Sequence, residues 1–404
     1  MKKNTALFVS LTFVFFTIVD TNSQKTVHQL IVDFDDEFSK METVTNNRFK
    51  SSGAFQEYYY GDFFFEANLK AWQATGDIKY FNRMKGWIDD MMRSAIVINE
   101  GSGAGCKGWL TTDIEKYGIY AKRSGQHLWE YYTWRHVAQL LRIIHQSPLF
   151  KKKTEAIASN WYNNVLNFIE VNIWEKWHDF FPDVFYRNIA HIATHSMAIS
   201  HELYIITNEN RYKKAYEAIS HKGMPNWDGS RNSFRNILEL NPNTPSAYVW
   251  QWHWNKADGT NSVQPRMQDT THSDAIISNL LMLWEQGNHW TDDDMLKFTS
   301  AWQNVIYEGI GVTDFSFWWN IDGTSPNDGF TPQKYIGKRV PQFKLQIQGW
   351  LLLGQFDATL QLNMENNVKD KQHKQPYSGF LAYNRKLLND GRPVYPEFYY
   401  PVNN

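Results

Sequence analysis

Two short stretches of the chain share one pattern, Thr75-Gly-Asp-Ile-Lys-Tyr80 and Thr207-Asn-Glu-Asn-Arg-Tyr212. Each lies between two amphipathic runs, and its glycine or asparagine occupies the position where helices commonly end in the left-handed conformation. The acidic residue that follows is suited to the first turn of the next helix. Both stretches therefore predict a tight turn between two packed helices.

Further amphipathic runs surround these turns. Helical pairs are expected at Leu128–Gln146 with Lys153–Asn172 and at Ser273–Gln286 with Asp292–Tyr307, and a last helix is expected at Gln346–Phe356. Long, polar, aromatic-rich connections lie between helices at Glu100–Trp109, Lys222–Pro265 and Asp314–Pro341. Connections of this length in a compact chain are usually functional. The pattern predicts an all-α fold, an (α/α)n toroid or barrel of helical hairpins whose long loops form a cleft.

The N-terminus has the features of a secretory signal peptide. Lys2 and Lys3 precede the apolar run Ala6–Val19 and a polar exit, whereas a membrane span needs ~20 apolar residues. An uncleaved anchor helix is the alternative interpretation. Cys106 is the one cysteine, so no intramolecular disulfide can form. We expect residues 1–24 to be removed and residues 25–404 to form a single catalytic domain that is secreted or periplasmic and is not inserted in a membrane.

The composition excludes some classes of protein. The 404 residues contain 41 Lys and Arg against 42 Asp and Glu, and this balance argues against binding to nucleic acid. The 42% of hydrophobic residues argues against disorder. Phe, Trp and Tyr make up 16% of the chain, which is compatible with core packing or with flat rings that bind sugars.

A polar stripe is predicted on one helix. Asn188, His191, His195 and Glu202 fall within a narrow arc at helical spacing, while the opposite positions are mostly apolar. These side chains could face a negatively charged ligand, or the histidines could be hydrogen-bonded structural residues. Zinc is a weaker interpretation, because histidines at i and i+4 lack a clear third ligand.

Two other segments could contribute to the same site. Arg266, Asp269 and His272 precede or begin an apolar helix, and a loop with Arg and His at a helix N-terminus is suited to holding a carboxylate. Helix capping alone is the alternative. On the helix that begins near Leu128, Tyr132, Arg135 and His136 share a side and could line the same cleft, although a partly solvated amphipathic face is the simpler explanation.

The segment Tyr248-Val-Trp-Gln-Trp-His-Trp254 alternates aromatic and other residues. In an extended conformation Tyr248, Trp250, Trp252 and Trp254 would share one face. Trp250 and Trp252 are therefore candidates for stacking on sugar rings. The alternative is a short strand packed on the helices.

Taken together, these segments resemble the secreted α/α-toroid polysaccharide lyases, and most nearly the alginate and glucuronan lyases of polysaccharide lyase family 38. The stretches that carry the resemblance are the helix with Asn188, His191 and His195, the run Gln268–Ala275, and the following Leu283–Gly287 and Trp290–Met295. Related lyases carry a tyrosine some fifty residues after the histidine, and Tyr248 lies 53 residues after His195.

The resemblance implies β-elimination in an anionic uronic-acid polymer. Asn188, His191, Arg266 and His272 would neutralise the uronate carboxylate, and His195 and Tyr248 would exchange protons with the substrate, with either one as the base. Tyr132, Arg135, Trp250 and Trp252 would bind the substrate. No cofactor would be required. A metal ion bound at His272 or on the His191/His195 helix is the alternative.

Two alternatives to the lyase follow from the same fold. A glycoside hydrolase would need two acidic side chains, for which Asp269, Asp274 and Asp328 are candidates. A non-catalytic glycan-binding protein would use the aromatic side chains alone.

Overall fold

The computed structural model describes residues 24–51, 55–98, 105–109, 127–147, 159–225, 232–254, 266–307, 316–341, 346–368 and 375–390. The predicted signal peptide lies outside this part of the chain, apart from its last residue. Within the described residues, no helix is both long and apolar enough to cross a membrane.

Both predicted turns are confirmed. Gly76 and Asn208 adopt left-handed backbone conformations, with φ of 69° and 59°. After the first turn, the Asp77 side chain accepts a hydrogen bond from the backbone N–H of Lys79 at 2.9 Å and caps the next helix. After the second turn, Glu209 occupies the N-cap position without a side-chain cap. The left-handed residue reverses the chain in both cases, so that each pair of helices packs side by side.

Six helical segments of the described chain form an inner ring. In chain order they are α3 (Phe55–Thr75), α6 (His127–Gln146), α11 (Ala190–Thr207), α14 (Thr270–Trp284), α16 with η7 (Gln348–Leu351 and Leu352–Phe356), and α18 (Ser378–Asp390). Each segment packs against the next, and α18 packs against α3, which closes the ring. The expected α/α toroid is therefore the observed architecture.

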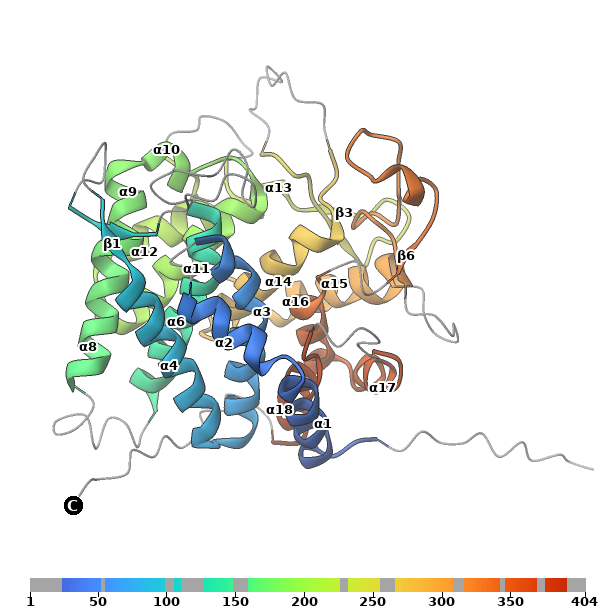
Figure 1. Ribbon diagram of the computed structural model, residues 1–404. Helices are drawn as coiled ribbons and strands as arrows, with labels where there is room; N and C mark the ends of the chain where they lie inside the picture. The colour runs from blue at the N-terminus through green and yellow to red at the C-terminus, as the bar shows by residue number, and fades with distance from the viewer. Residues whose placement is uncertain are drawn as a thin grey trace, which may run out of the picture.

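The remaining longer helices pack outside this ring (Figure 1). They are α1 (Val27–Ser39) on α18, α4 (Ile78–Ser94) on α3 with α2 (Glu42–Ser51) beside both, α8 with η2 (Ser159–Phe168 and Ile169–Glu175) on α6, α12 with η3 (Asn210–Glu217 and Ala218–Lys222) on α11, α15 with η4 (Asp292–Ser300 and Ala301–Ile306) on α14 and η7, and α17 (Ala358–Asn367) on α18 and η7. Shorter helical turns are α9 (Lys176–Phe180), α10 (Pro182–Phe185), α13 (Phe234–Ile237) and η5 (Gln333–Tyr335).

The described connections contain three antiparallel strand pairs of two residues each. They are β1 with β2 (Ile96–Val97 and Lys107–Gly108), β3 with β4 (Glu239–Leu240 and Tyr248–Val249), and β5 with β6 (Ser316–Phe317 and Val340–Pro341). Single β-bridges join Ile189 to His253 and Asp269 to Asn320. These bridges fasten the connections to the residues immediately before α11 and α14.

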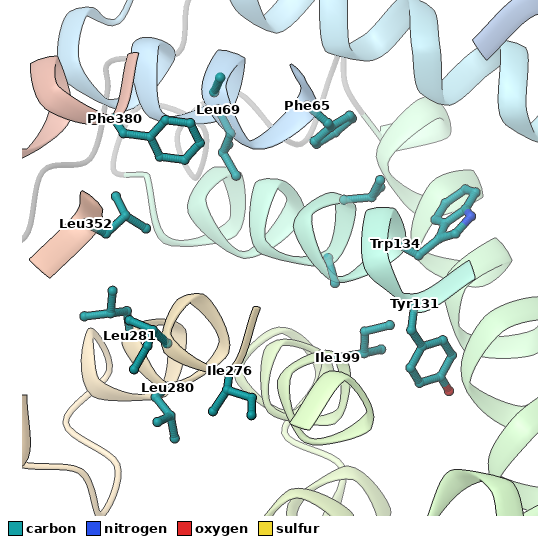
Figure 2. Packing of buried hydrophobic residues seen from close by; sticks show 14 of the residues in the cluster. Phe65, Leu69, Tyr131, Trp134, Ile199, Ile276, Leu280, Leu281, Leu352 and Phe380 are labelled. Carbon is teal, nitrogen blue, oxygen red and sulfur yellow. The ribbon is translucent and has the colours of Figure 1, made fainter. Parts of the chain in front are cut away.

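Aromatic side chains make up a large part of the core between the helices. Figure 2 shows Phe65, Tyr131, Trp134 and Phe380 packed with aliphatic residues from α11, α14 and η7 in one core. Eight tryptophans are almost completely buried, namely Trp72, Trp109, Trp134, Trp174, Trp250, Trp254, Trp302 and Trp350. Core packing therefore accounts for much of the aromatic content.

Candidate active site

The inner helices α6, α11 and α14 run in the same direction. At the starts of α11 and α14, the rings of His191 and His272 lie 4.4 Å apart. At the other end, Arg142 near the end of α6 donates to Glu202 of α11 at 2.5 Å and to Glu285, which follows α14, at 2.9 Å. The N-terminal ends of these helices therefore meet at one end of the ring, which we call the mouth.

Seven residues form what we call the mouth cluster: His191, Trp252, Arg266, Asp269, His272, Asp328 and Phe330. At its centre, the guanidinium carbon of Arg266 lies 4.4 Å from the ring centre of Trp252 and 3.8 Å from that of Phe330. Phe330 is 60% exposed, so the cluster has an aromatic surface open to solvent. Cation–π contacts of this kind hold the guanidinium and both rings in place.

Two carboxylates approach different nitrogens of Arg266. Asp269 Oδ2 lies 3.9 Å from Nη2, and Asp328 Oδ2 lies 4.0 Å from Nε. Burial lowers the pKa of Arg266, and the two carboxylates act in the opposite direction. Arg266 thus places Asp269 and Asp328, from two separate segments, in one charged group.

Asp269 has two roles at the start of α14. Its Oδ1 accepts a hydrogen bond from the backbone N–H of His272 at 3.0 Å, and its Oδ2 lies 2.8 Å from Nδ1 of the same histidine. Burial alone would raise the pKa of Asp269, but His272 and Arg266 hold it below its usual value. The side chain of His272 is 34% exposed. The arrangement is a buried carboxylate that orients a solvent-facing imidazole.

Asp328 is fixed by its own turn. Its Oδ1 accepts hydrogen bonds from the backbone N–H groups of Phe330 and Thr331 at 3.0 and 2.8 Å. Burial opposes ionisation, yet these N–H groups, Thr331 and Arg266 hold the pKa of Asp328 below its usual value. The same turn places Phe330 over Arg266. The second oxygen, Oδ2, is the one that faces Arg266.

A second polar group, the axial cluster, lies deeper in the ring. Its residues are Asp62, Glu66, Tyr132, Arg135, His136, His195, Asp274, Ser278 and Asn279, and all are at least 95% buried. Ser278 Oγ donates to Glu66 Oε1 at 2.6 Å. Because α3 and α14 are opposite members of the ring, this hydrogen bond crosses its centre.

Arg135 connects the helices within the axial cluster. Its Nη1 donates to Asn279 Oδ1 at 2.9 Å and lies 3.2 Å from Nδ1 of His195, while Nη2 donates to Asp62 at 3.1 Å. Burial and the nearby Arg135 charge hold the pKa of His195 well below its usual value. His195 is therefore a neutral ring whose Nδ1 faces a guanidinium.

The structure brings most of the predicted site residues into these two clusters. Tyr132, Arg135 and His195 meet in the axial cluster, where the rings of Tyr132 and His195 lie 4.4 Å apart. His191, Trp252, Arg266 and His272 meet in the mouth cluster. His191 and His195 are one turn apart on α11, so this helix joins the two clusters.

Three predicted residues lie elsewhere. Asn188 precedes α11, because the helix begins only at Ala190, and its side-chain amide donates to the carbonyl of Trp254 at 3.4 Å. Its predicted place on the helical stripe is therefore wrong. Trp250 is 1% exposed and packs against Phe234, Phe298 and Trp350, so its predicted stacking on sugar is also wrong.

The third is Tyr248, whose hydroxyl donates to Asp294 of α15 at 2.9 Å. Its ring packs on Phe298, also from α15. The described contacts of Tyr248 therefore lie with an outer helix, whereas those of His195 lie in the axial cluster. The structure does not join the two residues in one acid–base pair.

Several members of the axial cluster are not among the residues predicted from the sequence. Asp62, Glu66 and Asn279 lie within aromatic or aliphatic helical runs, where a charged or amide side chain has no solvent to face. Asp62 and Glu66 are also spaced at i and i+4, which puts them on one face of α3. Acidic residues at that spacing inside an aromatic helix were the available signal.

The described residues contain one group of three side chains spaced as metal ligands. It consists of Asp62, Glu66 and His136, with their ligand atoms within 4.8 Å of one another. The expected metal positions at His272 and on the His191/His195 helix are not in this group. Nδ1 of His272 instead faces Asp269.

No model of a known protein family matches the sequence, and no curated protein matches it. Three solved structures with a similar arrangement are of one protein, the GH76A α-1,6-mannanase of Salegentibacter sp. HEL1_6. They are the enzyme itself (TM-score 0.41), an inactive double variant in complex with α-1,6-mannotetrose (0.40), and a second inactive double variant in complex with α-1,6-mannotriose (0.39). Each is 12% identical and covers 90% of this chain and 99% of its own.

These comparisons contradict the prediction of a uronic-acid lyase. The similar solved structures are mannanases, and none of the three is a polysaccharide lyase of family 38. The separation of Tyr248 from His195 removes the acid–base pair on which the elimination chemistry depended. The prediction of an alginate lyase that acts by β-elimination is therefore wrong, whereas the prediction of an α/α toroid is confirmed.

Proposed function

We propose that this chain hydrolyses glycosidic bonds of a polysaccharide at the mouth cluster. The observation that carries the proposal is the Asp269–His272 pair, which lies with the Asp328 carboxylate around Arg266, beside exposed aromatic rings. Glycoside hydrolysis needs a proton donor for the leaving oxygen and a carboxylate that activates water or attacks the anomeric carbon. The chemistry requires no cofactor.

Each group has a role in this proposal. His272 is the proton donor, because its ring faces solvent and Asp269 stabilises positive charge on it from Nδ1. Asp328 is the second carboxylate, since backbone N–H groups fix its Oδ1 and leave Oδ2 for water or substrate. Trp252 and Phe330 stack on sugar rings.

The charge of the mouth cluster favours an uncharged glycan. Arg266 was expected to bind a substrate carboxylate, but Asp269 and Asp328 already provide two negative charges beside it. A uronate at this position would compete with both carboxylates for Arg266. The predicted signal peptide would direct the enzyme out of the cytoplasm. Polysaccharides of this kind are degraded outside it.

The test is product analysis on a panel of neutral polysaccharides that includes α-1,6-linked mannan. Hydrolysis releases new reducing ends without the ultraviolet absorbance of an unsaturated sugar. Asp328→Asn should abolish the release. Asp322→Asn is the matched control, because Asp322 also accepts hydrogen bonds within its own turn, from Thr324, but does not contact Arg266.

Three results would contradict the proposal. Binding of the glycan without release of reducing ends would indicate a glycan-binding protein. An unsaturated product would indicate elimination. Full activity of Asp328→Asn would remove the carboxylate pair as the catalytic centre.

A further inference from the structure

The ring axis contains three electron-rich atoms that face one another without a donor between them. His136 Nε2 lies 3.5 Å from Asp62 Oδ1 and 3.5 Å from Glu66 Oε2. His136 is fully buried, and both its Nε2 and Asp62 Oδ1 lack a hydrogen-bond partner. An unpaired polar atom in such a position costs about 1–3 kcal/mol by mutational measures unless something else satisfies it.

The hydrogen bond that His136 makes through Nδ1 bears on which of its ring nitrogens carries the proton. Its Nδ1 lies 3.3 Å from Oε1 of Gln139, one turn further along α6. With Oε1 of Gln139 as the acceptor, Nδ1 carries the ring proton and Nε2 presents a lone pair. A lone pair that faces two carboxylate oxygens is stabilised by a proton or a metal ion between them.

Each carboxylate uses its other oxygen for a protein partner. Asp62 Oδ2 accepts from Arg135 at 3.1 Å, and Glu66 Oε1 accepts from Ser278 at 2.6 Å. One oxygen of each is thereby anchored and the other turned toward His136. Hydrogen bonds from surrounding residues orient the ligands in metal sites in this way. The contact between Nδ1 of His136 and Gln139 is a further example.

Two of the three ligand separations fit a transition-metal ion, and the third, between the two carboxylate oxygens, is at most 4.8 Å. Two ligands that each lie about 2.1 Å from a tetrahedral ion are about 3.4 Å apart, close to the 3.5 Å from Nε2 to each carboxylate oxygen. Asp274 adds a third carboxylate to the surroundings, while Arg135 and the buried Lys70 supply positive charges.

We propose that a divalent metal ion of the zinc or manganese type binds on the ring axis, with Asp62, Glu66 and His136 as its ligands. Its role is structural. The ion joins α3 to α6 beneath the mouth cluster, and it keeps Arg135 in contact with Asp62 and His195. It takes no part in the proposed hydrolysis, so the site stands or falls independently of that activity.

The test measures metal content and thermal stability of the full secreted chain, produced without a histidine tag. Element analysis should find about one zinc or manganese ion per chain. Because the site is buried, the ion is removed by unfolding in denaturant with a chelator. After refolding, added Zn²⁺ or Mn²⁺ should raise the melting temperature, and Ca²⁺ at the same concentration should raise it less, since imidazole is a poor calcium ligand.

Glu66→Gln should reduce the metal content at least tenfold, while Glu202→Gln is the matched control. Glu202 is an equally buried carboxylate, but it pairs with Arg142 at the other end of the ring. If Glu66→Gln does not fold, Ser278→Ala keeps all three ligands, and it should weaken zinc affinity about tenfold in chelator competition. Wild-type chain that holds no metal, and whose melting temperature is unchanged by refolding with either ion, would overturn the proposal. Equal metal content in Glu66→Gln and wild type would also overturn it.

Discussion

Asp269 and His272 form the one hydrogen-bonded carboxylate–imidazole pair of the mouth cluster, with 2.8 Å between Oδ2 and Nδ1. The same carboxylate caps α14 through the backbone N–H of His272. Helix geometry therefore sets the position of the proposed proton donor. Any change at Asp269 acts on both the helix and the imidazole, so the two effects need to be separated.

Asp269→Asn separates them, because asparagine is as good an N-cap as aspartate but carries no charge. We expect activity to fall about a hundredfold or more, since the imidazolium loses its carboxylate. The melting temperature should change little. Asp357→Asn is the control, because Asp357 caps α17 through Thr359 and Leu360, and α17 packs on α18 and η7. Unaltered activity of Asp269→Asn would reject the pair as catalytic.

Asp294 should dominate the acid sensitivity of the region around α15. It accepts hydrogen bonds from Arg235 at 2.5 and 2.8 Å and from Tyr248 at 2.9 Å. Burial would raise its pKa, but the Arg235 pair and the N-cap hydrogen bonds from Thr291 hold it well below 3.8. A depressed pKa in the folded state gives stability that is present above about 3.9, the unfolded value, and is lost as the pH falls further.

Asp294→Asn should therefore lower the free energy of unfolding at pH 7, by about 1.5–3 kcal/mol for lost charge-assisted hydrogen bonds. It should also flatten the decline in stability below about pH 4, near the unfolded pKa of an aspartate. Urea unfolding across the pH range measures both effects. An acid decline as steep as that of the wild type would show that other carboxylates are responsible.

Tyr248→Phe tests whether this tyrosine belongs to the chemistry. The variant loses one hydrogen bond to Asp294, so its stability should fall by about 1 kcal/mol. Its kcat should stay within about twofold of wild type, because the hydroxyl faces α15 and not the mouth cluster. A kcat loss of about a hundredfold with normal stability would return Tyr248 to the catalytic site.

The helical hairpins could be predicted because their signals are local. Gly76 and Asn208 mark helix ends by backbone conformation alone, and each lies beside an acidic residue that begins the next helix. Tyr132 and Arg135 could be placed on a common side for the same reason, because helical spacing fixes it. The prediction for Asn188 was wrong because the helix begins two residues later. A helix boundary depends on tertiary contacts, such as the hydrogen bond from the Asn188 amide to the carbonyl of Trp254.

The irregular connections were less predictable. The alternation of aromatic residues in an extended strand predicted that Trp250 and Trp252 share one face. The segment is a strand only at Tyr248–Val249, and after it only single β-bridges form, at Gln251 and His253. The backbone can turn between bridges, so Trp250 enters the core and Trp252 reaches the mouth cluster. The grouping of Asp269 with Asp328 arises from contacts between two distant segments, for which the sequence contains no local signal.

Arg266→Lys should damage the mouth cluster although the charge is kept. Only a planar guanidinium can lie against Trp252 and Phe330 while its different nitrogens approach Asp269 and Asp328. We expect kcat/KM to fall about tenfold, which corresponds to about 1.4 kcal/mol. Arg339→Lys is a suitable control. Arg339 also lies over a tryptophan, Trp318, and both residues belong to the connection that carries Asp328. Wild-type kinetics for Arg266→Lys would make Arg266 a simple surface charge.

Trp250 and Trp252 provide a matched pair that separates core packing from substrate binding. Trp250 is almost fully buried against Phe234, Phe298 and Trp350, so Trp250→Ala should cost ~3–5 kcal/mol of stability and leave the KM of the folded fraction unchanged. Trp252 lies at the mouth, half-buried between His191, Arg266 and His272. Stacking on a sugar acts on ground and transition states alike, so Trp252→Ala should raise KM for long glycans more than it lowers kcat. Thermal melts and initial rates on both variants check the prediction, and a Trp252→Ala protein with normal KM and a large loss of stability would assign this residue to the core as well.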